Sequence, residues 1–164
     1  MLDAAVLNRY PQADCRAIQA LLKEKCREDG HKIVVLDDDP TGVQTVHDVS
    51  VYTDWSYESI KKGFEEDNKL FYILTNSRGF TVEQTTRAHL GIGENVARVS
   101  EETGIDYVIV SRGDSTLRGH YPLETELLAQ AEETYRGKPV DGEIICPYFK
   151  EGGRFTIDNV HYVK

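Results

Sequence analysis

The sequence has few cysteines and no long hydrophobic run. Its three cysteines, Cys15, Cys26 and Cys146, are odd in number and far apart, which fits neither a disulfide framework nor a CxxC metal site. No apolar stretch approaches the roughly 18 residues that a membrane span needs. The N-terminus also lacks the basic start and apolar core of a secretory signal. We therefore expect reduced cysteines, a cytoplasmic location and no membrane partner.

Positive charge is scarce as well. Lys and Arg number 19 against 28 Asp and Glu, which gives a formal net charge of -9. Nucleic acid is bound mainly through Lys and Arg, so it is not an expected partner.

The chain also has no GxxxxGK[ST] nucleotide-binding run, and Gly91-x-Gly93 lacks a third glycine. With 164 residues, of which 40% are hydrophobic, it has the size and composition of one ordinary globular domain.

Short apolar segments alternate with amphipathic ones along the chain. The spacing predicts helices over residues 12–28 behind Pro11, over 55–64, over 81–102 with a Thr81/Gln84 capping box, and from Pro122 onward. Apolar runs predict strands over residues 33–36, 49–53, 70–74, 106–110 and 143–146. This alternation indicates an α/β fold with a mostly parallel sheet flanked by helices. Two alternating runs around Asp158-Asn159 predict a C-terminal β-hairpin.

Polar residues gather after the predicted strands, in residues 37–42, 75–79, 111–120 and 147–154. Ligands of open parallel sheets bind beyond the carboxyl ends of the strands, where such loops meet. Arg side chains beside Asp side chains suit a small polyol with a carboxylate, because Arg binds carboxylates bidentately and Asp accepts from hydroxyls. Any one loop alone would indicate an ordinary turn, and Ser115 and Thr116 suit helix capping as well as ligand contact. Together the loops predict a polyhydroxy acid as the ligand.

The motifs in these loops resemble the N-terminal domain of the four-carbon acid sugar kinases. The run 37–42 is similar to the family's Ala-Asp-Asp-Leu/Phe-Thr-Gly, and the run 75–78 to its Thr-x-Ser-Arg. The most specific family stretch, Asp-Ser-Thr-Leu-Arg-Gly, stands complete at residues 114–119, and Gly-Arg-x-Thr and Tyr-Val follow at 153–156 and 162–163. The resemblance covers about residues 32–164. Departures at Asp37, Ser111, Arg112 and His120 leave the choice of sugar acid open.

The resemblance implies a two-domain kinase for erythronate-, threonate- or oxo-tetronate-like acids. Residues 31–164 would form the sugar-acid-binding domain and residues 1–30 an N-terminal helical extension. A C-terminal nucleotide-binding domain, absent from this chain, would bind ATP and magnesium. No cofactor or metal site is expected in the chain itself. Because the terminal hairpin leaves an open strand edge, we also expect a homo-oligomer.

The resemblance also assigns site residues. Asp38 and Asp39 are the candidate catalytic residues, and one of them would accept the proton of the attacking hydroxyl. Arg78, Arg118 and Arg154 are the candidates for the substrate carboxylate. The expected substrate-binding residues are Thr41, Ser77, Arg78, Asp114, Ser115, Arg118, Gly153 and Arg154.

Two other functions fit parts of the sequence. Asp37-x-Asp39-x-Thr41 after an apolar strand resembles the first motif of the haloacid-dehalogenase-like phosphatases, with Asp37 as nucleophile, Asp39 as acid/base and Mg²⁺ as cofactor. Those enzymes also need a Lys and a later acid pair. This chain has no Lys between residues 70 and 137, and Arg118 stands where the second acid should fall. The other alternative is a sugar-acid-binding module without catalysis.

Overall fold

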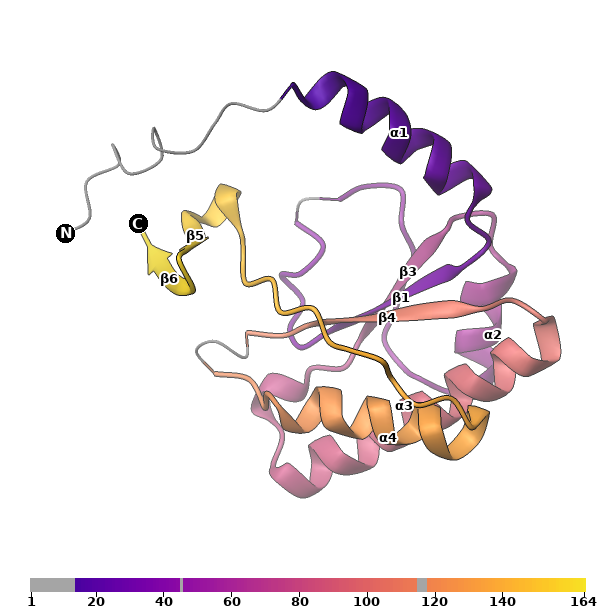
Figure 1. Ribbon diagram of the computed structural model, residues 1–164. Helices are drawn as coiled ribbons and strands as arrows, with labels where there is room; N and C mark the ends of the chain where they lie inside the picture. Colours follow the sequence, from indigo (N-terminus) through magenta and orange to yellow (C-terminus); the bar gives the residue numbers. More distant parts are fainter. Residues whose placement is uncertain (1–13, 45, 115–117) are drawn as a thin grey trace. The chain divides into compact units, whose positions relative to one another are not determined.

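The computed structural model describes residues 14–44, 46–114 and 118–164 (Figure 1). The internal contacts divide the chain into two units, Met1–Gly30 and His31–Lys164. The first unit contains helix α1 (Cys15–Glu28), which confirms the predicted N-terminal helix. The side chain of Asp14 caps α1 by accepting a hydrogen bond from the backbone N–H of Arg16. Pro11, the expected first-turn residue, lies outside the described residues.

The second unit contains a four-stranded parallel sheet with the order β2-β3-β1-β4. Its strands are β1 (Lys32–Asp37), β2 (Val51–Tyr52), β3 (Leu70–Leu74) and β4 (Tyr107–Arg112). The connecting helices are α2 (Tyr57–Glu65), α3 (Val82–Thr103) and α4 (Leu123–Arg136). The α/β fold class is therefore confirmed, as is the capping box of Thr81 and Gln84 at the start of α3. Among the described residues, no helix has the length and apolar character needed to cross a bilayer.

All three helices of this unit pack against one face of the sheet. Every second residue of a strand points to the same face, so Val34 and Leu36 of β1 lie beside Phe71 and Ile73 of β3. These side chains form one buried cluster with residues from each helix, namely Ile60, Phe64, Ile92, Val96, Val99 and Leu128. The shared core fixes the strand ends and so determines where the loops at that edge lie.

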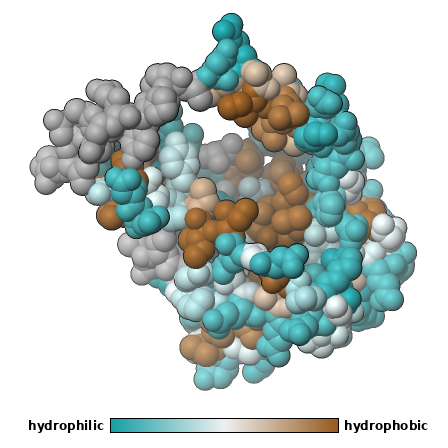
Figure 2. Space-filling view, in the orientation of Figure 1, coloured by the Kyte–Doolittle hydropathy of each residue, from teal (hydrophilic) through white to brown (hydrophobic). Residues whose placement is uncertain are grey.

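The opposite face of the sheet is only partly covered. Val108 and Val110 of β4 are 51% and 43% exposed, although parallel sheets usually have both faces buried. Figure 2 shows hydrophobic residues at the molecular surface. The exposed hydrophobic residues of this unit also include Ile144 and Ile145 in the segment after α4.

The strand predicted over residues 143–146 is wrong. These residues have no regular secondary structure, and Ile144 is 94% exposed. The β-branched residues Ile144 and Ile145 favour a strand only where neighbours pack against them. Here the chain after α4 does not pair with β4, which leaves Ile144 in solvent.

The chain ends in the predicted β-hairpin of β5 (Arg154–Ile157) and β6 (Val160–Val163), preceded by the short helix η3 (Lys150–Gly152). Asp158 and Asn159 form its turn with φ of 50° and 62°. Positive φ at both central residues matches the right-handed twist of the flanking strands, and Asn and Asp tolerate it. The hairpin prediction is confirmed.

Candidate functional site

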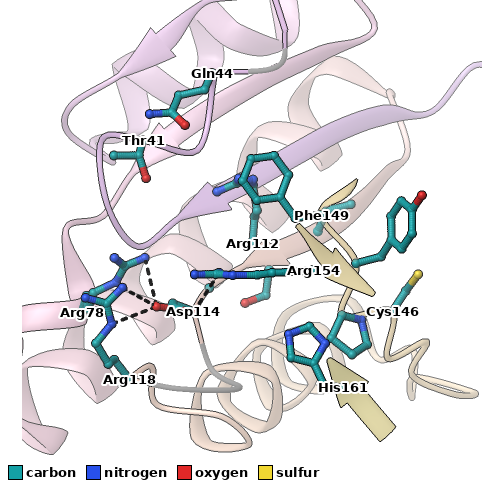
Figure 3. Close-up of a pocket in the computed structure, with 15 residues that line it drawn as sticks. Thr41, Gln44, Arg78, Arg112, Asp114, Arg118, Cys146, Phe149, Arg154 and His161 are labelled. Carbon is teal, nitrogen blue, oxygen red and sulfur yellow. Dashed lines mark hydrogen bonds and ion pairs between the residues drawn. The ribbon is translucent and has the colours of Figure 1, made fainter. Parts of the chain in front are cut away.

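The carboxyl ends of β1, β3 and β4 and the C-terminal segment surround a cavity of about 320 Å³ (Figure 3). The strand-end loops contribute Thr41, Gln44, Arg78, Arg112, Asp114 and Arg118 to its lining. The opposite wall comes from the segment after α4 and from the hairpin, with Cys146, Pro147, Tyr148, Phe149, Arg154 and His161. One wall is rich in charged side chains, whereas the other contains most of the aromatic ones.

Arg78 joins the ends of two strands. It lies in the short helix η2 (Ser77–Gly79) that follows β3. Its Nε and Nη2 donate to the two carboxylate oxygens of Asp38 at 3.1 and 2.9 Å, and its Nη1 contacts Asp39. The backbone N–H of Asp114 donates to the same Asp38 carboxylate at 2.9 Å. All three guanidinium nitrogens of Arg78 face carboxylates, so Arg78 ties together the loops that follow β1, β3 and β4.

Asp39 is held in its ionised form. Burial alone would raise the pKa of its carboxyl group, but the hydrogen bonds from Thr41 and the charges of Arg78 and Arg112 outweigh burial and lower the pKa. Both the hydroxyl and the backbone N–H of Thr41 donate to one Asp39 oxygen. A carboxylate with a lowered pKa is a weak proton acceptor at neutral pH.

Two further arginines, Arg118 and Arg154, contact the carboxylate of Asp114. Arg118 donates to its Oδ2 through Nε at 2.9 Å and through Nη2 at 2.6 Å, while Arg154 Nη1 lies 3.5 Å from Oδ1. The Asp114 side chain is 4% exposed, but those of Arg118 and Arg154 are 61% and 32% exposed. Two guanidinium groups therefore share the Asp114 carboxylate at the cavity, whereas Arg78 alone faces the carboxylates of both Asp38 and Asp39.

Asp37 and Arg112 form another pair, at the ends of β1 and β4. Arg112 Nη1 donates to Asp37 Oδ1 at 3.2 Å. Burial raises the pKa of Asp37 to about 6, against the opposing effect of Arg112. Gly42 passes directly over this carboxyl group, because a Cβ built on Gly42 would lie 1.6 Å from Asp37 Oδ2. Only glycine allows the loop after β1 to approach so closely.

A buried polar network supports the loop after β3. The Ser77 hydroxyl donates to Glu124 Oε1 at 3.3 Å, and the Thr75 hydroxyl lies 2.9 Å from the Ser77 hydroxyl. His89 Nε2 is 3.9 Å from the same Glu124 oxygen. Ser77, Glu124 and His89 are each at most 2% exposed. The network joins η2, which contains Arg78, to α3 and α4, so it helps to position the charged wall of the cavity.

The acidic run after β1 does not fit a metal ion as it stands. Ligand atoms of Asp37, Asp38 and Asp39 lie within 4.8 Å of one another, a spacing that a cation could use. However, Arg78 binds the carboxylates of Asp38 and Asp39, and Arg112 binds that of Asp37. A divalent cation would have to displace these guanidinium groups, so we assign it no place here.

The residues predicted from the sequence separate into three groups. Thr41, Arg78, Asp114, Arg118 and Arg154 line the cavity. Asp38 and Asp39 lie behind Arg78, Ser77 is buried, and Gly153 precedes Arg154 with its N–H bonded to the Lys150 carbonyl. Ser115 lies outside the described residues.

Sequence reasoning gave His161 no role, and it placed Arg112 in the polar run 111–120 without assigning it to the site; both residues line the cavity. Arg112 could have been found from its place at the end of a predicted strand. His161 belongs to no motif, and the alternation of the hairpin was its only signal.

Comparison with known proteins gives the family. A search of curated proteins found no match to the chain. A sequence-family model described as the sugar-binding N-terminal domain matches residues 33–164, which include the whole sheet except the first residue of β1, the hairpin and all the described residues that line the cavity. The ligand class of that family, a small sugar, agrees with a polar cavity at the carboxyl ends of a parallel sheet. The chain therefore belongs to the sugar-binding N-terminal domain family.

Proposed function

We propose that this domain binds a four-carbon sugar acid of the erythronate, threonate or oxo-tetronate type, as the acceptor half of an ATP-dependent sugar-acid kinase. The observation that carries the proposal is the pair of arginines at Asp114. Arg118 and Arg154 share that one carboxylate, and both side chains are accessible from the cavity. A ligand carboxylate would balance the second guanidinium through charge-assisted hydrogen bonds.

The contacts within the site distinguish the roles of the three candidate arginines. Arg154 lies 3.5 Å from Asp114, at the outer limit of a hydrogen bond, so it can turn to a ligand at little cost. Arg118 is the most exposed of the three, and its contacts with Asp114 use Nε and Nη2, which leaves Nη1 for a ligand. Arg78 holds Asp38 and Asp39 and thereby positions the loops. Arg118 and Arg154 are thus the proposed carboxylate-binding residues.

The size of the cavity favours a small ligand. Sites for drug-sized molecules run from about 300 to 1,000 Å³, and this cavity of about 320 Å³ lies at the lower end of that range. A sugar acid of four carbons, with its bound water, suits this volume better than a nucleotide does. ATP and magnesium are therefore proposed to bind to a C-terminal domain, as in the kinases that the sequence resembles.

Phosphoryl transfer requires chiefly that the acceptor be positioned and charge be stabilised. The residues of this domain would supply the first of these by holding the acid and orienting its hydroxyl groups. The phosphatase alternative is not favoured, because its nucleophile, Asp37, is 2% exposed and paired with Arg112. A module that only binds the acid would use the same contacts.

Titration calorimetry tests the proposal. We expect threonate or erythronate to bind, and erythritol, which has the hydroxyls without the carboxylate, to bind at least tenfold more weakly. Arg118→Ala and Arg154→Ala should each weaken binding of the acid, whereas Arg16→Ala, which removes an exposed charge from α1, should not. Equal binding of acid and erythritol would overturn the assignment of the carboxylate site.

A second assay tests the kinase half of the proposal. The chain alone should consume ATP only at background rate with threonate, because no described nucleotide site holds the two reactants in line and the advantage of proximity is lost. Adding a separately expressed C-terminal nucleotide-binding domain should restore transfer. ATP consumption by the purified chain with a tetronate acceptor would contradict the division of roles between two domains.

A further inference from the structure

His161 is a cavity-lining residue for which the family motifs give no role. It lies on β6, directly opposite Thr156 of β5 in the antiparallel register. Because side chains alternate along a strand, His161 and Thr156 share one face of the hairpin with Arg154. In Figure 3, His161 and Arg154 lie on the hairpin side of the cavity, away from Thr41 and Gln44. The residue is therefore placed beside one of the proposed carboxylate-binding arginines.

The hydrogen bonds of Thr156 determine which nitrogen of His161 is protonated. The Thr156 hydroxyl donates its single hydrogen to the backbone carbonyl of Pro147. The same oxygen lies 3.3 Å from His161 Nδ1 and can only accept in that contact, so Nδ1 must be the donor. In the neutral imidazole, a proton on Nδ1 leaves Nε2 as a hydrogen-bond acceptor.

The acceptor nitrogen of His161, Nε2, receives no hydrogen bond from the described residues. Nε2 is buried and has no hydrogen-bond partner among the residues that the structure describes. A buried polar atom without a partner is unfavourable, and a group that supplies the missing hydrogen bond recovers that free energy. Because the ring lines the cavity, a ligand that fills the cavity is the group placed to do so.

The charges around the cavity indicate which group of a ligand His161 Nε2 would bind. The carboxylates of Asp38, Asp39 and Asp114 already face guanidinium groups, and a further free carboxylate would repel an anionic ligand. A neutral imidazole nitrogen accepts a hydrogen bond from a hydroxyl without that repulsion. The hairpin thus offers a cationic donor in Arg154 and a neutral acceptor in His161, which match the two kinds of group in a sugar acid.

We propose that His161 recognises a hydroxyl group of the bound sugar acid through Nε2, with Thr156 holding the ring in the tautomer that makes Nε2 an acceptor. This inference rests on the proposed function, since it names the group that reads the hydroxyls of the proposed ligand. It makes His161 a residue that determines specificity, complementing the arginines that bind the carboxylate.

Three variants test the role of His161 by titration calorimetry with threonate. His161→Phe keeps a planar ring but removes the acceptor, and we expect affinity to fall about tenfold, the equivalent of one net hydrogen bond. His161→Gln can place an amide oxygen near the position of Nε2 and should restore most of that loss. Tyr162→Phe changes the next residue of β6, which points to the other face of the hairpin, and should bind like the wild type. Circular dichroism melting of each variant reports whether it is folded.

Analogues that each lack one hydroxyl separate recognition from a structural effect. The penalty of His161→Phe should disappear for the one deoxy acid whose missing hydroxyl normally meets Nε2, and should persist for the others. An equal penalty for every analogue would show that His161 acts on the fold and would overturn the inference. Wild-type affinity in His161→Phe would overturn it as well, with the proposed function intact. Failure of the wild-type protein to bind any tetronate would overturn both.

Discussion

Replacing Asp37 by Asn should stabilise the domain at neutral pH and leave it unchanged in acid. Asp37 is 2% exposed, and burial raises its pKa from 3.8 to about 6. Because the pKa in the folded state lies above that of the unfolded chain, the folded protein binds one more proton between about pH 4 and pH 6. Stability from this group is therefore complete below pH 4 and is lost as the pH rises through 6. Asn keeps the size of the side chain and an acceptor for Arg112.

The size of the effect follows from the pKa. A rise from 3.8 to about 6 is roughly two units, and each unit corresponds to about 1.36 kcal/mol. Asp37→Asn should thus gain about 3 kcal/mol at pH 8 and close to nothing at pH 3.5. For a protein of this size, that gain corresponds to a rise in Tm of roughly 6 to 12 °C.

Urea denaturation at several pH values, followed by circular dichroism, measures this difference. Asp39→Asn is the matched control, because the pKa of Asp39 is lowered and its ionised form stabilises the fold. That variant should lose stability at pH 8, and the loss should shrink as the pH falls below the ordinary pKa of Asp. A gain for Asp37→Asn that is the same at pH 3.5 and pH 8 would refute the assignment to a buried charge.

Three other substitutions test separate parts of the site. Arg118→Lys should weaken threonate binding about as much as Arg118→Ala, tenfold or more, because the point charge of lysine cannot replace the planar guanidinium fork. Near-wild-type affinity of Arg118→Lys in calorimetry would exclude Arg118 from the carboxylate-binding residues. Gly42→Ala should lower Tm by roughly 2 to 10 °C, since its Cβ meets the Asp37 carboxyl group, and an unchanged melting curve would contradict this. Glu124→Leu should cost about 1 to 3 kcal/mol in urea titrations by removing the acceptor of the Ser77 hydroxyl, whereas Glu124→Gln should cost less; equal losses would argue against the network.

Local patterns predicted the elements that the core requires. The apolar runs of β1 and β3 and the capping box at Thr81 depend on neighbours in sequence, and all formed as expected. The run Glu143–Cys146 has equally favourable residues, but strand formation depends on a partner strand that the chain does not bring to it. A strand can therefore be predicted from its sequence only where the strand that pairs with it can be predicted as well.

The members of the site were easier to predict than their roles. Sequence motifs placed Arg78, Arg118 and Arg154 at one edge of the sheet, and the structure brings all three to the cavity. The motifs did not reveal that Asp38 and Asp39 form ion pairs with the Arg78 guanidinium group, because that pairing depends on distances between loops. Which arginine remains available to a ligand is a property of the assembled fold.

The contact between Arg154 and Asp114 has a consequence for the motions of the C-terminal hairpin. The strand-end loops are tied to the sheet by short hydrogen bonds, whereas this ion pair between the hairpin and those loops is 3.5 Å long. A ligand carboxylate seated between Arg118 and Arg154 would act as a removable cross-link between the two segments. The bound hairpin would then open less often, and its amide hydrogens would exchange with solvent more slowly than in the free protein.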